Sequence, residues 1–161
     1  MKKLYLIRHA KSSWEQPLSD HDRPLSNRGF NDADIISKAL AEKEIVVDHV
    51  FSSTANRAKT TSMIICDTLK IAPKNIEYLG GLYDFNGTTV IDTIKNVSDK
   101  FKSIIVFGHN PAFTVAANTL GSQYFTNIPT CGVVCIEFDC NQWNQIEEGK
   151  TIFHLFPKEL K

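Results

Sequence analysis

Short apolar runs of strand length recur along this chain, and longer amphipathic stretches separate them. Residues 4–7 and 104–107 are continuous apolar runs, and residues 48–51 form a weaker one. Runs without polar alternation are typical of strands that are covered on both faces, as in the parallel sheets of α/β proteins. The pattern therefore predicts that these three segments are strands of a parallel sheet.

The amphipathic stretches repeat apolar or small residues at helical spacing, which predicts four helices. Their stripes are Phe30, Ala33, Ile36 and Leu40; Ala58, Ser62, Ile65 and Leu69; Val90, Ile94 and Val97; and Phe113, Ala116, Ala117 and Leu120. The ends of the fourth helix are the best marked. Asn110 suits its N-cap, Pro111 its first position and Gly121 its C-terminal stop.

The last part of the chain changes character. Residues 133–138 and 151–156 read as two strands joined by a polar loop, which favours an antiparallel addition to the sheet edge. There is no internal repeat, low-complexity tract or linker, so we expect one domain over residues 1–161. Strands that alternate with helices predict an α/β fold, a three-layer α/β/α sandwich with a mostly parallel central sheet and an antiparallel C-terminal edge.

Composition limits the partners. Hydrophobic residues make up 42% of the chain, and 18 Lys and Arg balance 18 Asp and Glu, so no overall field would hold nucleic acid or a membrane. No apolar run approaches the ~20 residues of a membrane span. The N-terminal run is also shorter than the ~7–15 apolar residues of a signal-peptide core, so we expect a cytoplasmic protein. A binding site for an anion must therefore be formed by a local group of residues and not by the net charge of the chain.

The four cysteines, Cys66, Cys131, Cys135 and Cys140, form no Cys-x-x-Cys pair. Cys135 and Cys140 differ by an odd number of residues and would face opposite sides of one strand. We therefore expect buried, reduced thiols rather than a zinc site.

Arginine or histidine follows each of the three apolar runs. Arg8 and His9 follow the first, Arg57 opens the helix after the second, and His109 follows the third. In open α/β sheets, ligands bind at the carboxyl ends of the strands, where helix N-termini also attract anions. Each motif alone fits a turn or a solvated surface, but their coincidence at three strand ends predicts a receptor for a phosphoryl group.

The order of these motifs resembles that of the histidine phosphatase superfamily. Leu-Ile-Arg-His-Ala at residues 6–10 resembles its Arg-His-Gly signature, with Ala10 in place of Gly. Ser-Ser-Thr-x-x-Arg-Ala at 52–58 resembles its second arginine motif, and Gly-His-Asn-Pro at 108–111 its second histidine motif. Residues 20–29, Asp-His-Asp-Arg-Pro-Leu-Ser-Asn-Arg-Gly, are similar to the signature of the small SixA-like phosphohistidine phosphatases.

The resemblance implies a role for each matching residue. His9 would attack phosphorus and carry a phosphohistidine intermediate, while Arg8, Arg57 and His109 hold the phosphoryl oxygens. Ser12 would add a further phosphate contact. The two arginines would also lower the pKa of His9 below its usual ~6.5 and keep the nucleophile unprotonated. No magnesium-type carboxylate cluster or Gly-x-x-x-x-Gly-Lys loop accompanies these residues, so neither metal nor cofactor is expected.

The proton donor to the leaving group is less well defined. Relatives carry a carboxylate before the third helix, and Asp84 is the only carboxylate in residues 82–87. The alternative is that Asp84 is a turn residue, with Glu15 and Asp22 as fallback donors. Imidazole, whose conjugate acid has a pKa of ~6.5, leaves more easily than an alkoxide, whose conjugate acid is as weak as water at ~16. A weak proton donor therefore favours phosphohistidine as the substrate.

The sequence thus predicts a metal-independent phosphatase that works through His9 and dephosphorylates phosphohistidine in a protein. One alternative is a small-molecule phosphomonoester phosphatase of the same superfamily, although the short chain leaves little room for the substrate lid of larger relatives. The other is a non-catalytic phosphate-binding adaptor, which should have lost one of Arg8, His9, Arg57 or His109.

Overall fold

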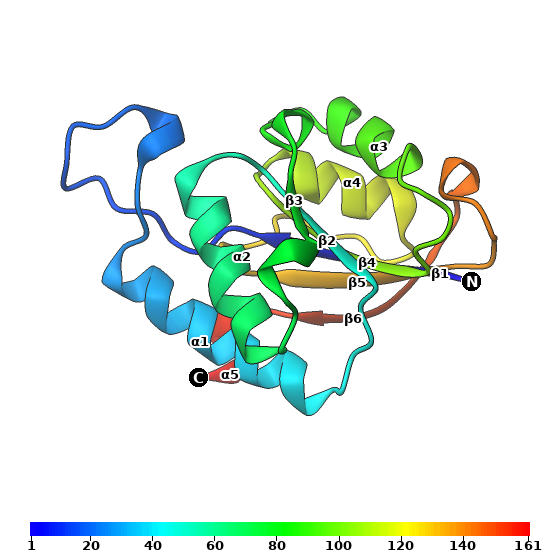
Figure 1. The fold of residues 1–161 in the computed structure, drawn as a ribbon, viewed down its shortest axis with the longest axis horizontal. Helices are drawn as coiled ribbons and strands as arrows, with labels where there is room; N and C mark the ends of the chain where they lie inside the picture. The colour runs from blue at the N-terminus through cyan, green and yellow to red at the C-terminus, as the bar shows by residue number, and fades with distance from the viewer.

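The computed structural model describes residues 1–161 as a sheet between two layers of helices (Figure 1). The strands are β1 (Lys2–Arg8), β2 (His49–Ser52), β3 (Ile76–Tyr78), β4 (Ser103–Gly108), β5 (Val133–Phe138) and β6 (Lys150–Leu155). The α-helices are α1 (Asn27–Glu42), α2 (Asn56–Thr68), α3 (Thr88–Lys95), α4 (Ala112–Leu120) and α5 (Pro157–Leu160). The architecture confirms the predicted α/β/α sandwich.

The order of the strands brings the predicted strand ends together. The sheet runs β3-β2-β4-β1-β5-β6. β4 pairs in parallel with both β1 and β2, and β2 pairs in parallel with β3. β5 and β6 extend the β1 side in antiparallel fashion, which confirms the predicted C-terminal edge. Since β1, β4 and β2 are adjacent and parallel, their carboxyl ends meet at one edge of the sheet.

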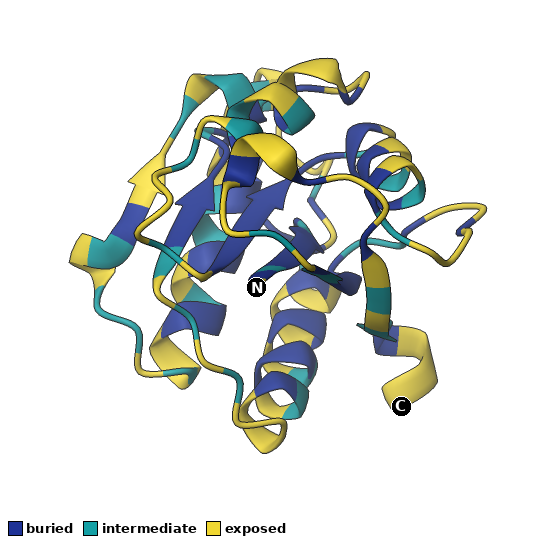
Figure 2. Ribbon diagram, turned by 90° about the vertical axis from the view of Figure 1, so that its right-hand side faces the viewer, coloured by how far each residue is buried: buried dark blue, intermediate teal, exposed yellow.

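Each central strand divides its apolar run between two cores, because successive side chains point to opposite faces. Leu4 and Leu6 pack in the core shared with α3 and α4, whereas Tyr5 and Ile7 pack in the core shared with α1 and α2. Figure 2 shows the consequence: the central strands are buried, and the helices are buried only on the side toward the sheet. The two-sided cover explains why these runs lack polar alternation.

The structure differs from the predicted elements at a few points. β3 was not predicted, because it has three residues of which only Ile76 is buried. Helix α4 begins at Ala112, so Pro111 rather than Asn110 occupies the N-cap. Asn110 still satisfies a free donor of this helix, since its side-chain oxygen accepts the backbone N–H of Thr114 at 3.0 Å. Gly121 ends the helix with an extended backbone, φ −102°, and not in the left-handed region.

The cysteines are all free thiols. Cys66, Cys131 and Cys135 are buried as predicted, and Cys140 is partly exposed. Burial raises the pKa of the Cys66 thiol to about 12, so this cysteine is an unreactive part of the core. Separately, none of the helices has both the length and the apolar character that crossing a membrane requires.

Gly29 marks the place where α1 packs against the loop that follows β1. The hydroxyl of Ser26 caps the helix by accepting the N–H of Gly29 at 3.1 Å. A Cβ at position 29 would lie 2.2 Å from the backbone oxygen of Lys11. Lys11 is two residues beyond His9, so this contact fixes the course of the chain where it leaves the strand end.

Replacing this glycine should therefore destabilise the protein. We expect Gly29→Ala to lower the free energy of unfolding by about 1–3 kcal/mol, because the obstructing atom belongs to the backbone and cannot rotate away. Urea denaturation of both proteins measures the difference. Gly80→Ala is the control, since no heavy atom lies within 4 Å of a Cβ at that position. Equal midpoints for the two variants would contradict the prediction.

Candidate active site

The structure brings together the four residues that the sequence predicts as a phosphate site. Arg8 ends β1 and His9 follows it, His109 follows β4, and Arg57 lies in the first turn of α2. The ring centroids of His9 and His109 are 5.2 Å apart. The guanidinium Nε of Arg57 donates to Nε2 of His9 at 3.3 Å. Arginine and histidine side chains from three strand ends thus lie together around the imidazole of His9.

These residues border a cavity of about 270 Å³ at the carboxyl edge of the sheet. Its lining residues are Arg8, His9, Lys11, Ser12, Trp14, Asp20, Arg23, Arg57, Phe85, Asn110 and Thr130. His109 is fully buried and lies behind this lining. The cavity is therefore cationic on its walls and has two exposed aromatic side chains, Trp14 and Phe85, at its rim.

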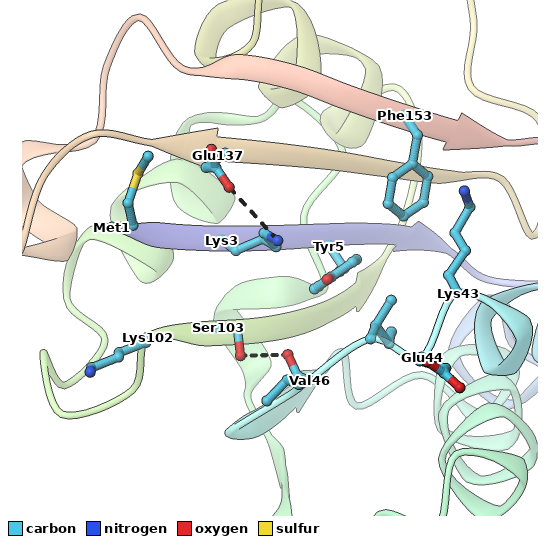
Figure 3. Close-up of a pocket in the computed structure, with 11 residues that line it drawn as sticks. Met1, Lys3, Tyr5, Lys43, Glu44, Val46, Lys102, Ser103, Glu137 and Phe153 are labelled. Carbon is cyan, nitrogen blue, oxygen red and sulfur yellow. Dashed lines mark hydrogen bonds and ion pairs between the residues drawn. The ribbon is translucent and has the colours of Figure 1, made fainter.

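A larger hollow of about 560 Å³ lies near the amino ends of β1 and β4 (Figure 3). Its lining includes Lys3, Tyr5, Lys43, Glu137 and Phe153. It contains no histidine or arginine and draws on the ends of the strands opposite to those that carry the predicted motifs. Size therefore does not identify the candidate site here, because the predicted phosphate-binding residues line the smaller cavity.

Backbone contacts define the orientation of His9. Its Nδ1 lies 2.7 Å from the carbonyl oxygen of Ala10, and its own carbonyl accepts the N–H of Cys131 at 2.9 Å. The N–H of Ala10 in turn donates to the hydroxyl of Thr61 at 3.0 Å. Because a carbonyl oxygen can only accept, the proton of the neutral ring is assigned to Nδ1. Nε2 is then the unprotonated nitrogen, and its lone pair accepts the hydrogen bond from Nε of Arg57.

Both histidines of the site are neutral at physiological pH. Burial is the main cause that lowers the pKa of His9 to about 3; the hydrogen bond to the Ala10 carbonyl opposes it, and the charges of Arg57, Arg8 and Arg23 add to it. Burial also lowers the pKa of His109 to about 3, together with His9 and Arg57. The ring of His9 is therefore unprotonated at neutral pH, which is the state that a nucleophilic histidine requires.

Three buried donors in the site have no partner within the protein. They are Nε of Arg8, Nε of Arg23 and Nδ1 of His109. The Nη1 of Arg8, in contrast, is paired within the protein, since it donates to the carbonyl of Ile128 at 2.8 Å. Burial lowers the pKa of Arg8, and repulsion from the neighbouring guanidinium of Arg57 lowers it further. Buried donors are rarely unpaired, so this arrangement fits an oxyanion that accepts from several of them at once.

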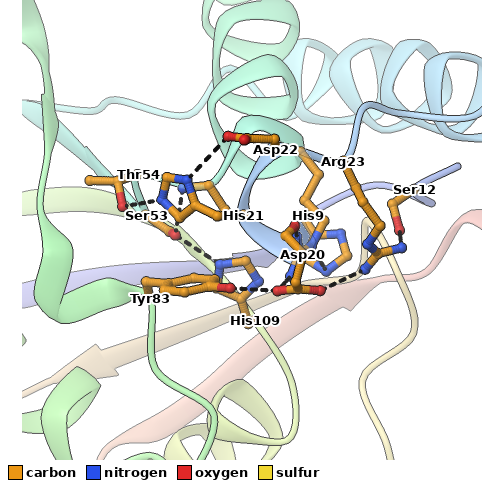
Figure 4. A network of polar contacts seen from close by, with 12 residues as sticks. His9, Ser12, Asp20, His21, Asp22, Arg23, Ser53, Thr54, Tyr83 and His109 are labelled. Carbon is orange, nitrogen blue, oxygen red and sulfur yellow. Dashed lines mark hydrogen bonds and ion pairs between the residues drawn. The ribbon is translucent and has the colours of Figure 1, made fainter. Parts of the chain in front are cut away.

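The residues that hold the arginines in place were not predicted from the sequence. The carboxylate of Asp20 joins two arginines and a tyrosine: it accepts from Nη2 of Arg57 at 2.9 Å, from Nη2 of Arg23 at 3.1 Å and from the hydroxyl of Tyr83 at 2.5 Å. Figure 4 shows Asp20 between Tyr83 and Arg23. Asp20 and Arg23 fall in the segment that resembles the SixA-like signature, and that segment was the one available signal. Tyr83 gave no signal in the sequence.

The role of Asp20 is to bind the arginines and not to donate a proton. Its partial burial raises the pKa of the carboxyl, but the hydrogen bonds from Tyr83 and Arg57 outweigh this effect and hold the pKa well below its usual range. The same contact raises the pKa of the Tyr83 phenol. Asp20 is therefore ionised at neutral pH.

Of the two remaining predicted site residues, Ser12 lies in the cavity and Asp84 lies at the start of α3. Ser12 lines the cavity, and its hydroxyl accepts from Nη1 of Arg23 at 2.6 Å, so it supports an arginine of the site. The carboxylate of Asp84 instead accepts three backbone N–H groups at the start of α3, from Asn86 at 3.2 Å, Gly87 at 3.1 Å and Val90 at 3.0 Å. The geometry favours the turn-residue alternative for Asp84 over the expected proton donor. The fallback residues Glu15 and Asp22 are also outside the cavity lining.

The family model of the histidine phosphatase superfamily (branch 1) matches residues 4–104, which is more than half of the chain. The chain therefore belongs to the histidine phosphatase superfamily. The uncharacterized protein Rv1276c of Mycobacterium tuberculosis (strain ATCC 25618 / H37Rv) is 33% identical over 153 residues, with 89% of this chain and 93% of the relative covered.

Solved structures show the same fold. The protein histidine phosphatase SixA, solved in complex with tungstate, superposes with a TM-score of 0.83 at 20% identity, and 99% of each chain is covered. Phosphoglycerate mutase from Bacillus anthracis strain Sterne gives a TM-score of 0.69 at 15% identity, with 84% of this chain and 87% of the mutase covered. The resemblance that the sequence motifs indicated is thus confirmed, at the level of the superfamily and of the SixA-like fold.

The depressed pKa values predict a loss of stability in acid. A histidine of the unfolded chain titrates near ~6.5, whereas His9 and His109 titrate near 3 in the folded protein. Between these values the unfolded state binds more protons, so stability falls as the pH falls. Each histidine contributes a loss of about 2 kcal/mol between pH 6.5 and pH 5. Urea denaturation at both pH values should show a smaller acid loss for His109→Asn, and an unchanged loss would contradict the assignment.

The position of Asp84 predicts that it acts in stability and not in catalysis. Asp84→Ala should lower the free energy of unfolding by about 0.5–2 kcal/mol, because the first turn of α3 loses its acceptor. Asp84→Asn keeps an acceptor oxygen but cannot deliver a proton, and we expect its kcat on an aryl phosphate to match the wild type. A drop in kcat of about a hundredfold or more in Asp84→Asn would instead establish Asp84 as the general acid.

Proposed function

We propose that this protein is a phosphohistidine phosphatase that acts on phosphorylated proteins, with His9 as its covalent nucleophile. The observation that carries the proposal is the surroundings of His9. Its imidazole is neutral, and its unprotonated Nε2 accepts a hydrogen bond from the guanidinium of Arg57, which lines the cavity with it. Such a site binds a phosphoryl group and attacks it with the same set of residues.

The reaction has two steps. The oxygens of the incoming phosphoryl group accept hydrogen bonds from Arg8, Arg57 and His109, and Nε2 of His9 attacks phosphorus as the bond to the leaving group breaks. The leaving nitrogen of the substrate imidazole takes up a proton from solvent. Water then attacks the phosphorus of phosphorylated His9, which releases inorganic phosphate and restores the lone pair.

The carboxylates around the site favour a nitrogen–phosphorus bond as the substrate. Asp20 is ionised and bound to two arginines, and Asp84 caps α3, so neither supplies a proton to a leaving group. Imidazole, with a conjugate acid of pKa ~6.5, needs this help far less than an alcohol, whose pKa is as high as that of water at ~16. The same site would cleave simple alkyl phosphates slowly.

The rim of the cavity suits a side chain that projects from another protein. Trp14 and Phe85 are 73% and 41% exposed, and both line the cavity. Aromatic faces at the entrance can stack against a flat imidazole. The anion donors are arginine and histidine, and no three His, Cys, Asp or Glu side chains gather where they could hold a metal ion. We propose that the reaction needs no metal.

The proposal is tested by measuring phosphate release from EDTA-treated protein. We expect the wild type to dephosphorylate a phosphohistidine peptide in preference to an aryl phosphate, and to form an acid-labile phosphoenzyme. His9→Ala should lose about a thousandfold or more in kcat on both substrates and form no phosphoenzyme, since the nucleophile is gone. His154→Ala, which removes a histidine of β6 outside the cavity, is the control and should behave as wild type.

Other outcomes point elsewhere. Equal rates for wild type and His9→Ala would refute the covalent mechanism. A clear preference for phosphate esters would favour a small-molecule phosphomonoester phosphatase, and tight phosphate binding with no turnover of either substrate would favour a phosphate-binding adaptor.

A further inference from the structure

A buried contact between Ser53 and His109 lies behind the reactive cavity and is not used in the steps above. Ser53 follows β2 directly, and its hydroxyl Oγ lies 2.8 Å from Nε2 of His109. Both residues are fully buried. Figure 4 shows the serine on the far side of the imidazole from Asp20. The contact therefore joins the carboxyl end of β2 to that of β4.

The direction of this hydrogen bond follows from the other contact of the hydroxyl. Oγ of Ser53 accepts the backbone N–H of Ala55 at 3.2 Å. The hydroxyl has one proton to donate, and Nε2 of His109 is the acceptor within its reach. If Nε2 carried a proton instead, the serine proton would be buried with no acceptor, which is rare in folded proteins. Nε2 is therefore the acceptor, and the ring proton of His109 is on Nδ1.

The other nitrogen of the same ring is in the opposite situation. Nδ1 of His109 is buried and has no partner within the protein. Burial, His9 and Arg57 lower the pKa of His109 to about 3, so the ring carries one proton and not two at neutral pH. The location of that single proton decides whether the ring presents a donor or a lone pair to a phosphoryl oxygen.

We propose that Ser53 is a positioning residue that holds His109 as its Nδ1–H tautomer, so that the neutral ring donates a hydrogen bond to a phosphoryl oxygen. This inference rests on the proposed function in taking the phosphoryl group as the acceptor. A ring with its proton on Nε2 would turn a lone pair toward the anion and repel it. Ser53 thus acts on the substrate only through His109.

The comparison with His9 shows why the partner of each ring matters. The carbonyl of Ala10 is next to Nδ1 of His9, so the proton points away from the cavity and Nε2 offers a lone pair. The hydroxyl of Ser53 is next to Nε2 of His109, so the proton is on the nitrogen left free. The two rings have the same tautomer, yet one serves as a nucleophile and the other as a donor.

The tautomer can be measured without any turnover, by nitrogen NMR of protein labelled at histidine, with the His109 signals assigned by their loss in His109→Asn. At neutral pH we expect the wild type to show a protonated Nδ1 and an unprotonated Nε2. Ser53→Ala should shift His109 toward the other tautomer and weaken the binding of inorganic phosphate by about tenfold to a hundredfold, the value of a hydrogen bond to a charged group.

Two further variants separate this effect from a loss of packing. Ser53→Thr keeps the hydroxyl and should retain both the wild-type tautomer and most of the phosphate affinity. Ser37→Ala removes a buried hydroxyl that donates to the carbonyl of Ala33 in α1, outside the site, and should leave both readouts unchanged.

The proposal is overturned if wild-type His109 carries its proton on Nε2. It is also overturned if Ser53→Ala keeps the wild-type tautomer, whether or not phosphate binding weakens, because the serine would then act by packing alone. Absence of phosphohistidine hydrolysis by the wild type would count against the proposed function and not against the tautomer, which is read from the resting protein.

Discussion

The parallel pairing of β4 with β1 and β2 is the constraint on which the site depends. Arg8 pairs with Gly108 and Ser52 with Phe107 in the last registers of the sheet. The pairing continues one step further, since the N–H of His9 donates to the carbonyl of Gly108 and the N–H of Ser53 to that of Phe107. The reactive side chains are thus placed by main-chain hydrogen bonds at the point where the strands end. A slip of one residue in either pairing would turn them to the other face.

The second requirement is electrostatic balance around a neutral histidine. The guanidinium groups of Arg8, Arg23 and Arg57 surround the cavity with one carboxylate, that of Asp20, among them. Without the carboxylate, three like charges would face one another across a small space. With it, the repulsion is reduced, and the lining, which also includes Lys11, still keeps an excess of positive charge that suits a phosphoryl anion. The histidines add no charge, because burial keeps their pKa values near 3.

Some features could be predicted from the sequence because they depend on local pattern. The continuous apolar runs identified β1 and β4, and residue types at the strand ends identified His9 and His109. β3 was not predicted because a strand of three residues, of which one is buried, has no recognisable pattern of apolar positions. The contact of Tyr83 with Asp20 joins residues 63 apart in two irregular segments, so it follows from the tertiary fold alone. For Asp84, the sequence supplied the residue type but not the three backbone N–H groups that it faces.

The carboxylate of Asp20 also bears on how the site empties. It occupies positions on Arg57 and Arg23 that a phosphate oxygen would otherwise take, so an arriving anion meets guanidinium groups that are already shared. An anion held by shared donors gains less than one that displaces only water, and it departs more readily. Under the proposed function, a phosphoryl group that brings binding contacts from the rest of a protein would offset that loss, whereas free inorganic phosphate would be held more weakly. The internal carboxylate would thereby favour release of the product over loss of the substrate.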